Sequence, residues 1–178
     1  QVFQGNSTAS SFQNAIVWGA DNGAVISQNS WGNDYDFDGN GVLSAYEKDY
    51  ALRDRISSSM AAAIDYFIAY AGCDKDGNQK PDSPMKGGLV VFAAGNDGIA
   101  NGVPASYAPV IAVGASKMTG RLSSFSNYGS WVDICAPGES IYSCVASGSY
   151  DLYNGTSMAC PHVSGALALL LSQFGGEG

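Results

Sequence analysis

A serine flanked by small residues stands at the start of an apolar run. Ser157 lies in the stretch 154–165, NGTSMACPHVSG, and the apolar run 166–171 follows directly. Gly155 permits a tight turn, Thr156 can cap the next turn, and the alanine and leucine run predicts a buried helix. Ser157 then falls in the first helical turn, where unpaired N–H groups and the helix dipole favour negative charge beside the hydroxyl. A serine in this position is well placed to act as a nucleophile, but a serine near a helix start is far more often a plain helix cap, so position alone does not decide between the two.

A run of alternating oxygen-bearing residues at 36–47 satisfies the calcium-loop pattern D-x-[DN]-x-[DN]-G-x5-E. Such a loop needs hard oxygen ligands at alternating positions, a glycine at its sharp turn, here Gly41, and a bidentate carboxylate at its last position. Leu43 is expected to point inward as an apolar anchor. The expected ligands are Asp36, Asp38, Asn40, the Val42 carbonyl, Ser44 or a water that it bridges, and Glu47. The sequence thus predicts bound Ca2+, with an acidic solvated loop as the alternative.

The two flanks of this loop differ. Residues 29–33 before it read as strand and turn, whereas a helix is expected from about 44 to 71 on the spacing of its apolar residues. The loop at 34–47 is therefore EF-like with only its exiting helix. A second acidic cluster at 74–82 also alternates oxygen ligands, but Gln79 replaces the turn glycine and no terminal glutamate follows. A second ion site and a simple turn are equally supported there.

Helices and strands alternate in the elements that must position these residues. A short helix is predicted at 10–22, where apolar residues share one face, and a strand at 24–29 follows it. The run at 88–94 is almost continuously apolar, which is typical of a parallel strand covered by helices on both faces. Residues 107–115 read as another buried strand, and residues 140–153 as a hairpin.

The length, composition and charge of the chain limit which class of protein it can be. The chain has 178 residues, of which 46% are hydrophobic, so it can bury the core of one domain. Its net charge of −8 argues against nucleic acid or an anionic membrane as partner, and no apolar run is long enough to span a bilayer. An acidic chain of this kind is expected to be secreted or at the cell surface. The four cysteines lack metal spacing; Cys135 and Cys144 can pair, Cys160 is expected to be buried, and mostly free thiols are favoured.

Several strings of the sequence are similar to those of one enzyme family. Gly-Thr-Ser-Met-Ala-x-Pro-His-Val-x-Gly at 155–165 resembles the nucleophile motif of the subtilisin-like serine peptidases, the subtilases. Ala-Gly-Asn at 94–96 resembles the segment that carries their oxyanion asparagine, and Ser-x-Gly at 30–32 resembles their substrate-pairing edge strand. The resemblance covers nearly the whole chain from about Ser11 onward, and by analogy the Val103-Pro104 bond is expected to be cis.

The resemblance implies a fold and a role for each of these residues. The implied fold is α/β and three-layered, with a mostly parallel sheet flanked by helices, truncated at both ends, so that residues 1–178 form part of a peptidase domain. By the same comparison, the EF-like calcium loop at 34–47 is an insertion in that domain. Ser157 is the nucleophile, and Asn96 donates to the oxyanion, a contact whose loss costs about 3 to 4 kcal/mol in the transition state. An extended peptide or protein substrate is expected to bind by β-augmentation to Ser30, Trp31, Gly32, Ala94 and Gly95.

The general base of the family and its orienting acid have no counterpart in this sequence. Subtilases use an Asp and a His that precede the serine, each in a glycine-rich motif, and neither motif occurs here. The single histidine, His162, follows Ser157 on the same predicted helix, and the offset of five residues leaves the two side chains about 140° apart around the axis. We therefore expect His162 to be a packing residue. The chain is expected to be a fragment lacking the N-terminal part of its domain and nearly inactive alone.

This interpretation has consequences for partners, and it leaves an alternative. The missing N-terminal segment of the domain is an expected partner, and its removal can expose a sheet edge that favours self-association. An α/β-hydrolase esterase, suggested by the approximate G-x-S-x-G at 155–159, is discounted because only His162 and Glu177 follow the serine. A non-catalytic, calcium-dependent peptide-binding module stays open, since a sheet edge can pair with peptides without chemistry.

Overall fold

The computed structural model describes residues 9–176, except for the side chains of Ala9 and Ser147. The described chain forms two compact units. Residues 9–27, 56–90 and 165–176 belong to the first unit, and residues 28–55 and 91–164 belong to the second.

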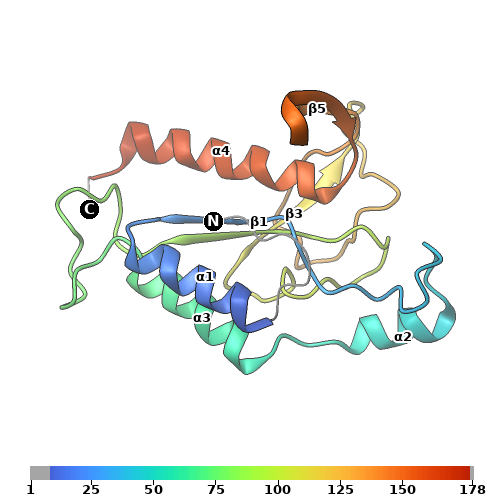
Figure 1. Cartoon of the computed structure of the whole chain (residues 1–178), viewed down its shortest axis with the longest axis horizontal. Helices are drawn as coiled ribbons and strands as arrows, with labels where there is room; N and C mark the ends of the chain where they lie inside the picture. Colours follow the sequence, from blue (N-terminus) through green and yellow to red (C-terminus); the bar gives the residue numbers. More distant parts are fainter. Residues whose placement is uncertain (1–8, 177–178) are drawn as a thin grey trace. The chain divides into compact units, whose positions relative to one another are not determined.

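The first unit contains two helices that lie side by side, α1 (Ala9–Asp21) and α3 (Ser58–Tyr70) (Figure 1). The helix predicted at 10–22 is thereby confirmed. Gly88, the residue before strand β2 (Leu89–Ala93), packs closely against α3. A Cβ on Gly88 would lie 2.5 Å from the Phe67 ring and 2.7 Å from the Ala71 Cβ, so only glycine fits there.

The helix predicted from about 44 to 71 is interrupted, and that prediction is wrong. The second unit's α2 (Ala45–Arg53) ends at Asp54, whose extended backbone (φ −62°, ψ 147°) turns the chain before α3 begins. The Asp54 carboxylate accepts hydrogen bonds from Tyr35 Oη at 2.9 Å and from Asn33 Nδ2 at 2.7 Å. These two bonds anchor Asp54 in its non-helical conformation, which the apolar periodicity does not report.

Four strands form one sheet in the order β1-β2-β3-β4. Their bounds are Ile26–Asn29 for β1, Leu89–Ala93 for β2, Ile111–Ser116 for β3 and Ile134–Pro137 for β4. β2 pairs in parallel with β3, with Val91 opposite Ile111, and β3 pairs in parallel with β4. The two inner strands are buried along most of their length, as expected of covered parallel strands. The α/β class with a mostly parallel sheet is confirmed, and the Val103-Pro104 bond is cis.

A hairpin and a long helix complete the described chain. β5 (Ile141–Val145) and β6 (Ser149–Tyr153) pair antiparallel around a short 3-10 turn (Ala146–Gly148), which confirms the predicted hairpin. α4 (Thr156–Phe174) follows directly and includes Pro161. Within residues 9–176, no helix combines the length and apolarity needed to cross a membrane. All four cysteines are free thiols, and Cys160 is fully buried.

Candidate active site and calcium loop

Ser157 lies in the first turn of α4, as the sequence predicts. Its side chain is half-buried, and its hydroxyl donates to the Ser30 carbonyl oxygen at 3.4 Å, which is long for such a donor. In return, the Ser30 hydroxyl donates to the Ser157 carbonyl oxygen at 2.8 Å. Gly155 has φ +152°, a value that L side chains rarely adopt, and it makes the tight turn before the helix. The reciprocal bonds fix the start of α4 beside the residue that follows β1.

The side chain of Asn96 is oriented by Thr156, its neighbour across the site. Asn96 Oδ1 accepts hydrogen bonds from the Thr156 N–H at 2.8 Å and from the Thr156 hydroxyl at 2.9 Å. The Thr156 hydroxyl in turn accepts from the Gly95 N–H at 3.1 Å, so its own proton is directed to Asn96. Thr156 therefore bridges to residues 95 and 96 instead of capping its helix. Because both donors act on Oδ1, the Asn96 amide is left with Nδ2 as the atom that can donate to a ligand.

Asn127 holds the turn that carries Asn96, a role that sequence reasoning missed. Its buried side chain donates from Nδ2 to the Ala94 carbonyl at 3.0 Å. Its Oδ1 accepts from the Asp97 N–H at 3.0 Å and from the Ile99 N–H at 3.2 Å. Gly95 (φ +103°) must be glycine, since a Cβ there would lie 2.3 Å from Asn127 Nδ2. A buried asparagine that serves three backbone groups of one turn fixes that turn's shape.

Trp31, in the predicted substrate-pairing segment, is held in one orientation. Its Nε1 donates to Asn29 Oδ1 at 3.1 Å, and its ring packs edge-on against Phe92 with centroids 5.0 Å apart. Asn29 is buried and donates from Nδ2 to the Val91 carbonyl at 3.3 Å. The indole is therefore half-buried and fixed, and it forms a rigid wall of this segment.

One pocket of about 200 Å3 brings most of the predicted site residues together. Its lining includes five of the seven residues predicted for catalysis and substrate binding: Trp31, Gly32, Gly95, Asn96 and Ser157. Ser30 adjoins it through its bonds to Ser157. Ala94 lies outside the lining, because its side chain is buried, its N–H donates to the Val113 carbonyl and its carbonyl accepts from Asn127. Asp34 and Asp97 also line the pocket, although their sequence context does not mark them out.

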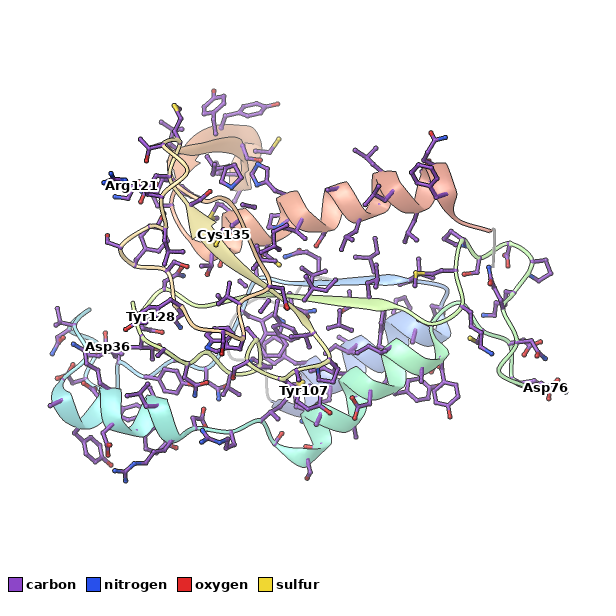
Figure 2. All side chains as sticks on the ribbon, turned by 180° about the vertical axis from the view of Figure 1, so that it is seen from behind. Asp36, Asp76, Tyr107, Arg121, Tyr128 and Cys135 are labelled. Atoms are coloured by element: carbon purple, nitrogen blue, oxygen red, sulfur yellow. The ribbon has the colours of Figure 1, made fainter. Side chains whose placement is uncertain are left out.

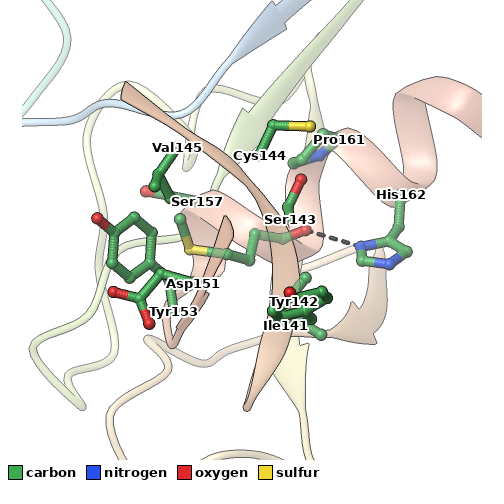
Figure 3. Close-up of a pocket in the computed structure, with 11 residues that line it drawn as sticks. Ile141, Tyr142, Ser143, Cys144, Val145, Asp151, Tyr153, Ser157, Pro161 and His162 are labelled. Carbon is green, nitrogen blue, oxygen red and sulfur yellow. Dashed lines mark hydrogen bonds between the residues drawn. The ribbon is translucent and has the colours of Figure 1, made fainter. Parts of the chain in front are cut away.

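His162 lies on the wall of a second hollow, of about 390 Å3, lined by the hairpin and the first turns of α4 (Figure 3). The imidazole is exposed, so the expectation that it is a packing residue is wrong. Its Nδ1 is 2.7 Å from the Met158 carbonyl oxygen, one helical turn earlier. A carbonyl oxygen only accepts, so this nitrogen carries the proton. Among the described residues, the hydroxyl of Ser157 bonds to Ser30 and not to this ring.

Cys160 is a nucleophile by residue type, but its surroundings make it inert. The thiol is fully buried beneath the start of α4, and its Sγ lies 3.6 Å from the Asn29 carbonyl oxygen. Burial raises the pKa of the Cys160 thiol, because the thiolate would lose its hydration. The neutral thiol therefore acts as a small core residue, as the sequence predicts, and Ser157 is the half-buried hydroxyl at the pocket.

The predicted calcium loop brings three carboxylates together. Oxygen atoms of Asp36, Asp38 and Glu47 lie within 4.8 Å of one another. Glu47 accepts from the Phe37 N–H and the Ser44 N–H, both at 2.8 Å, and hydrogen bonds from these two residues, those of Ser44 foremost, hold the pKa of Glu47 below its usual range. Three clustered hard oxygen donors fit a calcium ion, which prefers carboxylate oxygens as ligands.

The rest of the loop follows the predicted pattern in part. Leu43 is buried with Tyr35, Ala51 and Ile99, which confirms the inward anchor. Gly41 (φ +79°) makes the turn. α2 begins directly after the loop with a capping box between Ser44 and Glu47, while residues 30–36 are irregular, so the loop has only its exiting helix. Asn40 Oδ1 accepts from the Val42 N–H at 2.8 Å, so in this conformation that oxygen serves the backbone.

The second acidic cluster is organised as a turn. Asp74 Oδ1 accepts from the Asp76 N–H and the Asn78 N–H, each at 2.9 Å. Hydrogen bonds, the Asn78 N–H first among them, hold the pKa of Asp74 below its usual range. Figure 2 shows Asp76 on the loop that joins α3 to β2. Within the described residues, the three carboxylates at 36, 38 and 47 are the group gathered closely enough for a metal, which favours the turn over a second ion site at 74–82.

The sequence profile of the Subtilase family matches residues 2–176, and the chain belongs to that family. A thermophilic serine proteinase of Bacillus sp. strain AK1 is 56% identical over 89 residues, which are 49% of this chain and 22% of that protein. An extracellular protease of Xanthomonas campestris pv. campestris is 48% identical over 96 residues, covering 49% of this chain and 17% of that protein. The prenylagaramide maturation protease PagA matches in structure with a TM-score of 0.70 and 30% identity, over 97% of this chain and 54% of its own. The chain therefore spans about half of that solved protease and less of the two curated relatives.

Proposed function

We propose that this chain is the nucleophile-bearing part of a serine endopeptidase domain of the subtilisin type. Ser157 Oγ attacks a peptide carbonyl carbon while its proton passes to a base, and the carbonyl oxygen becomes an oxyanion. Asn96 Nδ2 donates to that oxyanion. Collapse of the adduct expels the amine with the proton and leaves an acyl-enzyme on Ser157, which water then hydrolyses.

The observation that carries this proposal is the bonding of Thr156 to Asn96. The two bonds hold Asn96 Oδ1 and leave the N–H2 group of the same side chain to donate, and Asn96 and Ser157 both line one pocket. A preorganised donor of this kind is worth more than a mobile one, because no reorientation is needed as charge develops. A serine that merely capped a helix would need no such partner.

The base and its orienting acid are proposed to lie outside the 178 residues. His162 is the single histidine of the sequence, and its Nδ1 is bonded to the Met158 carbonyl. The segment that supplies the base is therefore a partner of this chain, and the 178 residues alone are expected to be nearly inactive. A serine without a general base keeps only the acceleration that oxyanion stabilisation and binding provide.

Substrate, ion and location follow from the same site. An extended peptide is proposed to pair with residues 30–32 before the attack on its carbonyl. Asp36, Asp38 and Glu47, with the other predicted loop ligands, would hold a Ca2+ ion that neutralises the loop and fixes its fold; the ion takes no part in the chemistry. Secretion is proposed because the chain is acidic and a relative is an extracellular protease.

Labelling with a serine-directed fluorophosphonate, followed by mass mapping, tests the peptidase proposal. The 178-residue chain and the full-length protein would each be treated with calcium present. We expect labelling of Ser157 in the full-length protein, only slow labelling in the chain alone, and none after Ser157→Ala. A full-length protein that stays unlabelled at Ser157 would refute the assignment.

A non-catalytic peptide-binding module is the second candidate, favoured by the bonding of the single histidine to a backbone carbonyl. It retains the wall of Trp31 and the pocket but needs no base. Peptide binding by a full-length protein that resists fluorophosphonate would support this candidate over the peptidase.

A further inference from the structure

The pocket beside Ser157 carries two carboxylates, and its lining, all within the described residues, contains no lysine, arginine or histidine. Asp34 and Asp97 lie in that lining together with Asn96 and Trp31. We propose that this pocket selects a basic side chain, arginine or lysine, on the substrate residue whose carbonyl is attacked. The inference rests on the function proposed above, because it names the substrate class of the same site.

The placement of the pocket assigns it to that residue. Its lining joins residues from the segment that pairs with the substrate, Trp31 and Gly32, to the oxyanion donor Asn96 and the nucleophile. A peptide that lies along residues 30–32 with its carbonyl oxygen at Asn96 has the side chain of the same residue next to this opening. The hollow at the hairpin also contains Ser157 but lacks Asn96 and Trp31, so it serves another part of a bound peptide.

The two carboxylates that line the pocket differ in their surroundings. Asp97 is half-buried, and its Oδ2 has a distant contact of 3.5 Å with Asn127 Nδ2. Asp34 is exposed, and its Oδ1 accepts from the Asp36 N–H at 3.1 Å. Burial raises the pKa of Asp97. The cationic head of an arginine or lysine in the pocket would form charge-assisted hydrogen bonds with the side chains of Asp34 and Asp97.

Trp31 supplies the surface for the apolar stem of such a side chain. Its indole is fixed by the bond to Asn29 and by the packing on Phe92, so little order is lost when a ligand binds. Arginine and lysine carry long methylene stems beneath a cationic head, and the head is also attracted to an aromatic face. Asp34 and Asp97 are outside the predicted calcium ligands, so a loop filled with Ca2+ leaves both free for the substrate.

Binding of matched peptides to full-length protein carrying Ser157→Ala tests the proposal without any turnover. Two fluorescent hexapeptides would differ at one position, arginine in one and its neutral isostere citrulline in the other, and affinity would be read by anisotropy with calcium present. We expect the arginine peptide to bind about tenfold more tightly or better, which corresponds to about 1.4 kcal/mol. Asp97→Asn and Asp34→Asn should each reduce that preference at least about threefold, by the same conversion about 0.7 kcal/mol. Asp49→Asn, on α2 and outside the lining of both hollows, should leave it unchanged.

The outcomes separate this inference from the peptidase function. Equal affinities for the two peptides, or no binding of either at millimolar concentration, would overturn the basic preference. Labelling of Ser157 by fluorophosphonate in a protein without that preference would leave the peptidase proposal standing alone. An arginine preference in a protein whose Ser157 is not labelled by fluorophosphonate would instead support the specificity pocket and refute the peptidase proposal.

Discussion

Replacing Thr156 with valine should remove both hydrogen bonds of its hydroxyl and change little else, because valine has nearly the same shape and no oxygen. The hydroxyl accepts from the Gly95 N–H and donates to Asn96 Oδ1, and the side chain is fully buried. Without it the Gly95 N–H loses its acceptor, which costs about 1 to 3 kcal/mol of unfolding free energy. Asn96 keeps the second bond from the Thr156 backbone N–H, so its amide should be loosened but not released.

The assay compares Thr156→Val with Thr156→Ser in the full-length protein. Serine keeps the hydroxyl and removes one methyl group, which should cost about 0.8 kcal/mol. Urea denaturation would measure the unfolding free energy, and the rate of fluorophosphonate labelling would measure the reactivity of the Ser157 hydroxyl. Complete loss of one oxyanion donor lowers turnover about 10²- to 10³-fold, so a loosened Asn96 should slow labelling by about tenfold in the valine variant and little in the serine variant. Equal stabilities and equal labelling rates for the two variants would contradict the assigned role of the hydroxyl.

Four further outcomes are expected. Calcium at about 100 times its dissociation constant should stabilise the protein by about 2.7 kcal/mol in thermal unfolding. Glu47→Gln should abolish this stabilisation, whereas the control variant Asp49→Asn, on the same helix, should retain it. Asn96→Ala should lower peptidase turnover about 10²- to 10³-fold with peptide affinity nearly unchanged, and an equal loss of affinity would argue for a structural role. His162→Ala should change the labelling rate of Ser157 less than about threefold; a large drop would make that imidazole the base. The raised pKa of Asp97 means that the folded state holds its proton more tightly than the unfolded state, so this contribution to stability is present at low pH and is lost as pH rises through the folded-state pKa. Asp97→Asn should flatten the part of the stability profile that lies above the ordinary pKa of an aspartate, and an unaltered profile would count against it.

Features that depend only on residues close together in the chain were predictable from the sequence. The apolar run at 88–94 is a buried parallel strand, and the string at 155–165 places Ser157 in the first turn of α4. The oxygen spacing at 36–47 produced the cluster of three carboxylates, with Leu43 turned inward. These predictions succeed because backbone periodicity, a glycine at a tight turn and the ligand order of a loop are all local properties.

The orientations and hydrogen-bond partners of the side chains at the site could be learned only from the tertiary structure. Thr156 reads as a cap from its position, yet its hydroxyl bonds to residues 60 positions away and orients Asn96. Asn127 looks like an ordinary loop residue, yet it holds the turn that carries Asn96. Asp54 interrupts a helix that its apolar spacing supports, because Tyr35 and Asn33 bind its carboxylate. Each of these outcomes depends on a hydrogen bond between residues far apart in the chain, and such a partner exists only once folding has placed it within about 3 Å.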